Sequence, residues 1–342
     1  MKKWKLLTAA GFILAAGLMI TSCTGGDKNA VARYKDAGID MMAEGNYADA
    51  VESFDKALQN TGMRITPEAV DINYYKAAAL WQGGDFNGAV SVYTSLIEYD
   101  DKNPDPYFLR GCLYANERDI EKAVSDYKEA IKRNEADYDL YIAIYEQLYA
   151  LDFKDEAMTF LNLALEAENK SDVDSDIGRG RIYVYLNQFD AAEKALLKAK
   201  EKGDARADLY LAEIAEKQGD KEASMQYLEA YATSDKKTSE SLAALGSLLM
   251  ESKEYGRALE TFQEALSFEN VKNEKELRKN EIAALEYTGQ FTEAYQKARL
   301  FVADYPSEAD VIRELPFLLT RFEGPYTNEP QDVVEEDENS AN

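Results

Sequence analysis

The chain has 342 residues, 46% of them hydrophobic, which is enough for two average domains or one long repeat array. Acidic residues outnumber basic ones by 64 to 39, and the formal charge of −25 argues against nucleic-acid binding, which needs clustered cations. The chain contains no histidine, which excludes histidine-dependent catalytic triads and removes the commonest zinc ligand, so we expect no catalysis, metal or cofactor.

The N-terminus has the layout of an export signal. Three lysines within the first five residues precede an uncharged, mostly apolar run that is short for a membrane span. The run ends with aliphatic Ile20, two small residues and then Cys23, which resembles the lipobox of bacterial lipoproteins. The resemblance implies that residues 1–22 are a signal peptide and that Cys23 is the lipidated first residue of the mature chain.

Lipidation at Cys23 would determine where the protein acts. Two or three acyl chains, palmitate among them, would anchor it, because each buried CH₂ contributes about 0.8 kcal/mol. Residues 23–30 then form a lipidated cysteine and short polar tether. We expect the rest of the chain to lie outside the cytoplasm, held at the cell membrane or the outer membrane. The alternative is an uncleaved signal anchor in which Cys23 is an ordinary cysteine.

One packing pattern recurs along most of the remaining chain. An alanine returns about every 34 residues, a period typical of repeat proteins. These alanine positions are Ala50, Ala89, Ala123, Ala157, Ala192, Ala223, Ala258 and Ala294. Four residues later come the large positions, Phe54, Tyr93, Tyr127, Leu161, Leu196, Tyr227, Phe262 and Ala298. The preceding helix supplies the small positions, among them Gly38, Ala77, Gly111, Gly180, Ala212 and Gly246.

This arrangement resembles the tetratricopeptide repeat. A glycine or alanine on the first helix lets the second helix approach closely, and an aromatic on the second helix fills the remaining space. Turns such as Gly45-Asn46 and Gly84-Asp85 suit a left-handed residue followed by a helix cap. The resemblance implies an all-α fold, a right-handed superhelix of about eight helix-turn-helix repeats over residues 31–308.

The C-terminus is expected to close the array. Apolar residues within 309–323 predict a capping helix that covers the last repeat, with a kink at Pro316. Residues 324–342 carry the acidic cluster Glu335 to Glu338, which is typical of a disordered acidic tail.

Three repeats depart from the pattern. Tyr145 occupies the small position of the fourth repeat, and Ile282 occupies that of the eighth. Lys221 stands at the turn of the sixth repeat, where other repeats have an aromatic residue. We expect altered packing at these places.

In proteins that this chain resembles, the first helices line a concave groove that binds peptides. Mapping the chain onto that face predicts a partner-binding groove made of Tyr74, Trp81, Phe108, Tyr149, Arg181, Tyr185, Glu213 and Tyr287. Aromatic and arginine side chains offer a large contact area at low entropic cost, and the acidic residues favour a partner of basic character. The alternative for each aromatic is packing between repeats.

We therefore expect a non-catalytic scaffold that binds a protein or peptide in cell-envelope assembly or regulation. The alternative is a glycan- or solute-binding lipoprotein of an uptake system, in which groove aromatics stack on a sugar ring. An enzyme is the weakest hypothesis, since it would need a carboxylate pair in a closed pocket.

Two smaller features have two interpretations each. Asp172, Asp174 and Asp176 alternate as in a calcium loop, but Ile177 stands where the loop needs glycine. The simpler interpretation is that this acidic segment caps the next helix. Cys112 is either a reactive thiol or a small buried residue, and we favour the buried residue.

Overall fold

The structure is a computed structural model, and it describes residues 27–62, 65–167 and 172–321. Cys23 and the predicted tail at 324–342 lie outside these residues. The described residues form seventeen helices and no strand, which confirms the all-α solenoid. The helices are α1 (Lys28–Ala43), α2 (Tyr47–Gln59), α3 (Pro67–Gln82), α4 (Phe86–Tyr99), α5 (Pro104–Asn116), α6 (Ile120–Arg133), α7 (Tyr138–Ala150), α8 (Lys154–Glu166), α9 (Val173–Tyr185), α10 (Phe189–Glu201), α11 (Arg206–Gln218), α12 (Lys221–Ala232), α13 (Ser239–Glu251), α14 (Tyr255–Leu266), α15 (Glu274–Tyr287), α16 (Phe291–Asp304) and α17 (Ala309–Leu319).

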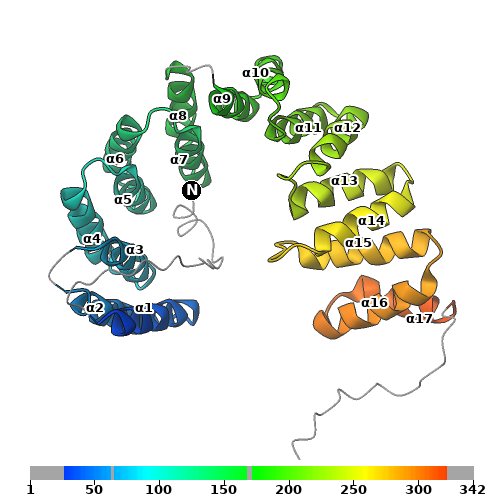
Figure 1. The fold of residues 1–342 in the computed structure, drawn as a ribbon, viewed down its shortest axis with the longest axis horizontal. Helices are drawn as coiled ribbons and strands as arrows, with labels where there is room; N and C mark the ends of the chain where they lie inside the picture. The colour runs from blue at the N-terminus through cyan, green and yellow to red at the C-terminus, as the bar shows by residue number, and fades with distance from the viewer. Residues whose placement is uncertain (1–26, 63–64, 168–171, 322–342) are drawn as a thin grey trace, which may run out of the picture. The chain divides into compact units, whose positions relative to one another are not determined.

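The chain divides into two compact units, one ending at Ala195 and the other beginning at Leu196. Within each unit, consecutive helices pack as antiparallel pairs, and the second helix of one pair also contacts the first helix of the next (Figure 1). Each pair therefore buries its apolar side against its neighbours in the chain, as expected of a repeat array.

A left-handed residue ends the first helix of each pair. It lies at Gly45, Gly84, Arg118, Asp152, Asn187, Gly219, Lys253 and Gly289, all with positive φ. The next residue then begins the second helix as its N-cap, and at Asp85 the side chain accepts a hydrogen bond from the Gly88 backbone N–H at 2.8 Å. The predicted turn chemistry is confirmed at the glycine and asparagine positions. Aspartate also tolerates this conformation at Asp152, whereas Arg118 and Lys253 adopt it without a favourable side chain.

The small and large positions meet as predicted. A Cβ atom added to Gly111 would lie 2.8 Å from Cε1 of Tyr127, and one added to Gly38 would lie 2.5 Å from Cε1 of Phe54. Tyr127 and Phe54 are completely buried. The first helix can approach the second this closely only because its small position has no side chain.

The sixth repeat has a different register from the one predicted. Ser224 and Leu228 are buried there, whereas Ala223 and Tyr227 are only partly buried. Ser224 follows Gly219 at the same distance that separates turn and alanine position in the other hairpins. The assignment of Ala223 and Tyr227 was therefore wrong by one residue. Serine can occupy the alanine position because the two side chains differ little in volume. The alanine of the expected type, Ala223, is one residue earlier and was assigned to that position instead.

The fourth and eighth repeats fill their interfaces in other ways. In the eighth, Ile282 at the small position and Ala298 at the large position are both buried, so the two sizes are exchanged. In the fourth, Tyr145 is only half-buried, while Leu161 at the large position is completely buried. The eighth repeat thus keeps one large and one small side chain at this interface, whereas in the fourth repeat the Tyr145 ring packs on Tyr149 and Tyr185.

Helix α17 packs against α16 at the end of the described chain. Val311 and Leu318 of α17 are buried, and Pro316 lies inside the helix. Among the described residues, no helix has both the length and the apolar character needed to cross a membrane.

Candidate partner-binding site

Two of the predicted groove residues belong to the core instead. Tyr74 and Phe108 are buried. The Asn103 side-chain amide donates a hydrogen bond to the Tyr74 hydroxyl at 3.1 Å, and burial raises the pKa of Tyr74. Phe108 packs on Tyr127, with ring centroids 5.9 Å apart. These two side chains are therefore not available to a partner, and the prediction that they line a binding surface is corrected.

Trp81 is half-buried at the end of α3. Its ring packs edge-on against Phe86, the first residue of α4, and Phe86 packs in turn against Tyr114 of α5. The ring centroids are 6.3 and 5.9 Å apart. This aromatic chain links one repeat to the next while leaving part of Trp81 accessible.

A second aromatic group in the N-terminal unit joins α7 and α9. The Tyr145 ring lies 5.3 Å from that of Tyr149 and 5.1 Å from that of Tyr185. The Tyr185 hydroxyl donates a hydrogen bond to Glu146 at 2.5 Å, and Tyr149 remains 47% exposed. The structure thus brings the predicted residues Tyr149 and Tyr185 together around Tyr145, which sequence reasoning had treated only as a packing anomaly.

Arg181 of α9 forms an ion pair with Asp139 of α7. Its guanidinium charge is therefore already partly neutralised within the protein. A partner carboxylate would have to compete with Asp139 for the same group.

In the C-terminal unit, the predicted residues Glu213 and Tyr287 lie on different repeats. Glu213 is exposed on α11 and lies 3.6 Å from Lys217 of the same helix. Tyr287 is 63% exposed at the end of α15, and its ring stacks on that of Tyr255 at 4.4 Å with an interplanar angle of 11°. Tyr287 is thus the most exposed aromatic side chain among the predicted residues.

Tyr287 borders a hollow of about 640 Å³ between α15 and α17, here called the α15–α17 hollow. It is lined by Lys279, Asn280, Ile282, Ala283, Glu286, Tyr287, Phe291, Asp310, Val311, Glu314 and Phe317. Most of these side chains belong to the first helix of the eighth repeat or to the capping helix. Of the eight residues predicted above to form the groove, Tyr287 lines this hollow.

The side chains that line the α15–α17 hollow include three acidic residues and one basic residue. Lys279 lies 2.5 Å from Asp310 and 3.5 Å from Glu308, so its charge is used within the protein. Burial and then the neighbouring carboxyl group of Glu314 raise the pKa of Glu286 to about 7. The Glu314 carboxylate adds to the effect of burial because a like charge nearby disfavours the ionised form of Glu286.

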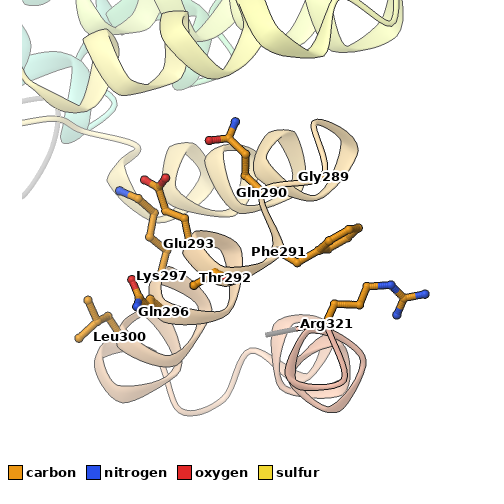
Figure 2. Close-up of a pocket in the computed structure, with 9 residues that line it drawn as sticks. All are labelled: Gly289, Gln290, Phe291, Thr292, Glu293, Gln296, Lys297, Leu300 and Arg321. Atoms are coloured by element: carbon orange, nitrogen blue, oxygen red, sulfur yellow. The ribbon is translucent and has the colours of Figure 1, made fainter. Parts of the chain in front are cut away.

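A second hollow, of about 650 Å³, lies beside the start of α16 and shares Phe291 with the first. Figure 2 shows Phe291 and Arg321 extending in the same direction, away from Glu293 and Lys297. The Arg321 guanidinium lies 3.7 Å from the ring centre of Phe317 and 5.4 Å from that of Phe291. The Lys297 ammonium lies 2.8 Å from the buried carboxylate of Glu281, so the basic groups of this hollow also have partners.

Sequence reasoning overlooked Tyr255, Phe291, Phe317 and Glu314. One available signal was the aromatic residue that begins many second helices. Phe86 and Tyr255 pack on the first helix of the next repeat, and Phe291 packs on the capping helix α17. Glu314 had no such signal, because its meeting with Glu286 depends on how α17 packs.

The acidic segment that begins at Asp172 and the cysteine Cys112 are both consistent with the simpler of the two interpretations given above. Asp172 is the N-cap of α9 and accepts a hydrogen bond from the Ser175 backbone N–H at 2.7 Å. No group of three or more potential metal ligands occurs in the part of the chain that the structure describes. Cys112 is buried, the Tyr127 hydroxyl donates to its sulfur at 3.6 Å, and burial raises the pKa of its thiol to about 12. Such a thiol is unreactive near neutral pH.

The repeats match known family models. One tetratricopeptide repeat model matches residues 35–105 and 177–238, and another matches residues 104–137 and 239–271. Together they cover more than half of the chain. The chain belongs to the tetratricopeptide repeat family. Tetratricopeptide repeats typically form scaffolds for protein interaction, which is the function that membership in this family supports. No curated protein sequence matches the chain.

Several solved structures are similar to this chain at low sequence identity. A tetratricopeptide repeat protein from Parabacteroides merdae is 18% identical, with a TM-score of 0.44 over 75% of this chain and 99% of that one. The APC/C hetero-tetramer Cut9–Hcn1 is 15% identical, with a TM-score of 0.45 over 83% of this chain and 54% of that one. The human IFIT1 dimer with PPP-AAAA is 14% identical, with a TM-score of 0.43 over 86% and 80%. These likenesses are of fold alone.

Proposed function

We propose that this tetratricopeptide repeat protein is a membrane-anchored, extracytoplasmic scaffold that binds a protein or peptide partner on the first helices of its repeats. Its role is in the assembly or regulation of the cell envelope. The observation that supports partner binding is the accessible aromatic surface on first helices, where Tyr149 and Tyr287 are each about half exposed or more. The lipobox-like segment ending at Cys23 supports the anchor.

Crosslinked capture from intact cells tests the partner site. The bait is the full-length protein, compared with a Tyr149→Ala/Tyr287→Ala variant. The matched control is Tyr99→Ala/Leu300→Ala, because these side chains are 52% and 65% exposed but belong to the second helices α4 and α16. We expect a defined envelope protein that the wild type and the control recover and that the first variant loses.

The remaining outcomes separate the alternatives. Equal recovery by all three baits would place binding away from the first helices. Recovery of no protein, together with tyrosine-dependent retention on immobilised oligosaccharides, would instead favour the glycan- or solute-binding lipoprotein. The glycan interaction should persist at high salt, whereas binding of a basic partner should weaken as the salt concentration rises.

The anchor has its own test. Labelling cells with radioactive palmitate should mark the wild-type protein and leave a Cys23→Ala variant unlabelled. Cys112→Ala is the control, since the buried thiol of Cys112 should not affect labelling. Equal labelling of wild type and Cys23→Ala would contradict lipidation at Cys23.

A further inference from the structure

The α15–α17 hollow combines apolar, aromatic and acidic walls. Its base is formed by Ile282 and Val311, which are buried. Tyr287 and Phe317 expose large parts of their rings at its edge. Glu286 and Glu314 supply carboxyl groups from its two helices. A ligand that fits must therefore offer both an apolar stem and a positive charge.

The basic side chains that line or border this hollow do not neutralise the two glutamates. Lys279 is paired with Asp310 and Glu308, and Arg321 lies over the ring of Phe317. Within the residues that the structure describes, no lysine or arginine forms an ion pair with Glu286 or Glu314. The pair is thus a local excess of negative charge that a cation from outside could balance.

The size and lining of the hollow favour an organic cation over a metal ion. Calcium or magnesium would require a compact set of six or more oxygen ligands. A space of about 640 Å³ that is bordered by aromatic rings is instead suited to a long side chain, because such rings attract cations and pack on methylene groups. Arg321 over Phe317 shows that a guanidinium already packs on a ring of this hollow.

We propose that the α15–α17 hollow binds a lysine or arginine side chain of a protein partner, with its charge between Glu286 and Glu314 and its stem along Tyr287. This inference deepens the proposed scaffold function and rests on it for the source of the side chain. The raised pKa of Glu286 is consistent with it, since a cation that enters beside Glu286 would favour the ionised form of its carboxyl group.

The test uses the full-length protein and two tripeptides of nearly identical shape. Acetyl-Gly-Arg-Gly-amide carries a guanidinium, and acetyl-Gly-citrulline-Gly-amide replaces it with a neutral urea. Binding is followed by the NMR signals of labelled isoleucine methyl groups, with that of Ile282 as the local reporter. We expect the arginine peptide to bind about tenfold more tightly than the citrulline peptide.

Variants then assign the preference to the glutamates. A Glu286→Gln/Glu314→Gln protein should bind both tripeptides equally weakly, whereas Glu213→Gln, which changes an exposed glutamate on α11, should behave like the wild type. Tyr287→Ala should weaken binding of both tripeptides, and it provides a second variant if the double glutamine variant loses its circular dichroism spectrum. Equal binding of the two peptides by the wild type, or no binding of either, would overturn the inference.

Crosslinked capture from cells distinguishes the proposed binding site in the α15–α17 hollow from the proposed scaffold function. If the wild type and the double glutamine variant recover the same envelope protein in equal amounts, the scaffold function stands and the α15–α17 hollow is not its recognition site. If no partner is recovered and the arginine peptide still binds selectively, the hollow is a site for basic ligands and the scaffold function fails.

Discussion

The contact between Gly111 and Tyr127 shows how single residues set the spacing of a hairpin. A Cβ atom at position 111 would meet two ring atoms of Tyr127 at 2.8 and 2.9 Å and the Ala123 carbonyl oxygen at 3.2 Å. Tyr127 is completely buried, and the carbonyl belongs to the backbone of α6, so neither group can move freely.

We therefore expect Gly111→Ala to lower the free energy of unfolding by about 1–3 kcal/mol, the usual effect of overpacking. Gly256→Ala is the matched control, because a Cβ atom there meets nothing within 4 Å. The control should gain a few tenths to about 1 kcal/mol from helix propensity. Urea unfolding of both variants measures the difference, and equal stabilities would contradict the close contact.

Lys253 offers the opposite experiment. It has a φ of +63° at the turn before α14, and its side chain is exposed. A left-handed conformation costs an ordinary residue about 1 kcal/mol, whereas glycine adopts it readily. Lys253→Gly should raise the free energy of unfolding by about 0.5–1 kcal/mol, while Gly289→Ala at the same place in the eighth repeat should lower it by a similar amount. Thermal unfolding that moved both variants in one direction would refute this explanation.

At the scale of the element, α5 and α6 are joined by a buried ion pair as well as by apolar packing. Arg110 donates from Nε and Nη2 to the two carboxylate oxygens of Asp126, each at 2.8 Å, and its Nη1 donates to Thr94 at 2.9 Å. Asp126 is buried and Arg110 is mostly buried. This geometry fixes the two helices relative to each other in the third hairpin.

Removing one partner should cost more than removing both. Arg110→Leu leaves the Asp126 carboxylate buried without its cation and should lower the free energy of unfolding by about 3 kcal/mol. The double variant Arg110→Leu/Asp126→Leu removes that unpaired charge and should recover a good part of the loss. Chemical unfolding of Arg110→Leu, Asp126→Leu and the double variant completes the mutant cycle. If the two losses of unfolding free energy simply add in the double variant, the two side chains are not coupled.

Sequence reasoning succeeded in most repeats because the repeat pattern is local. The hairpins, their turns and the contact of Gly111 with Tyr127 follow from residues that lie close together in the chain. The register of the sixth repeat was missed because Ser224 occupies the alanine position, and the residue before it, Ala223, matched the expected residue type. Binding residues were harder to predict. The position of Tyr74 along its helix indicates which face of the helix it lies on, but it does not show that Asn103 and the next repeat bury its side chain.

At the scale of the whole molecule, stability should respond to pH through Glu286. The pKa of Glu286 is raised to about 7 in the folded protein, above its ordinary value of 4.5. A raised carboxyl pKa means that folding is favoured while the group is protonated, and that this contribution is lost as the pH rises through about 7. The chain has no histidine that would titrate in the same range.

The wild-type melting temperature should therefore fall as the pH rises from about 5 to about 8, and it should fall less in a Glu286→Gln variant. The charged groups that face Glu286 are Glu314 and Asp310 on α17 and Lys279 on its own helix. Lys279 and Asp310 form an ion pair, and a Glu314→Gln variant should also flatten the profile by removing the neighbouring carboxylate. Calorimetry across this range measures the effect, and parallel profiles for all three proteins would count against it.

In the eighth repeat, Ile282 occupies the small position and Ala298 the large position, and this exchange restricts which mutations the repeat can tolerate. Replacing Ile282 with alanine alone would leave a cavity costing about 2–5 kcal/mol, and replacing Ala298 with phenylalanine alone would overpack the hairpin. Neither mutation is neutral without the other, so the eighth repeat cannot drift to the family's usual pair by single tolerated steps. A recombination that joined its first helix to the second helix of another repeat would set isoleucine against a large side chain, such as Phe54, Tyr127 or Leu161. The array therefore cannot lengthen or shorten through that hairpin without a second, compensating mutation.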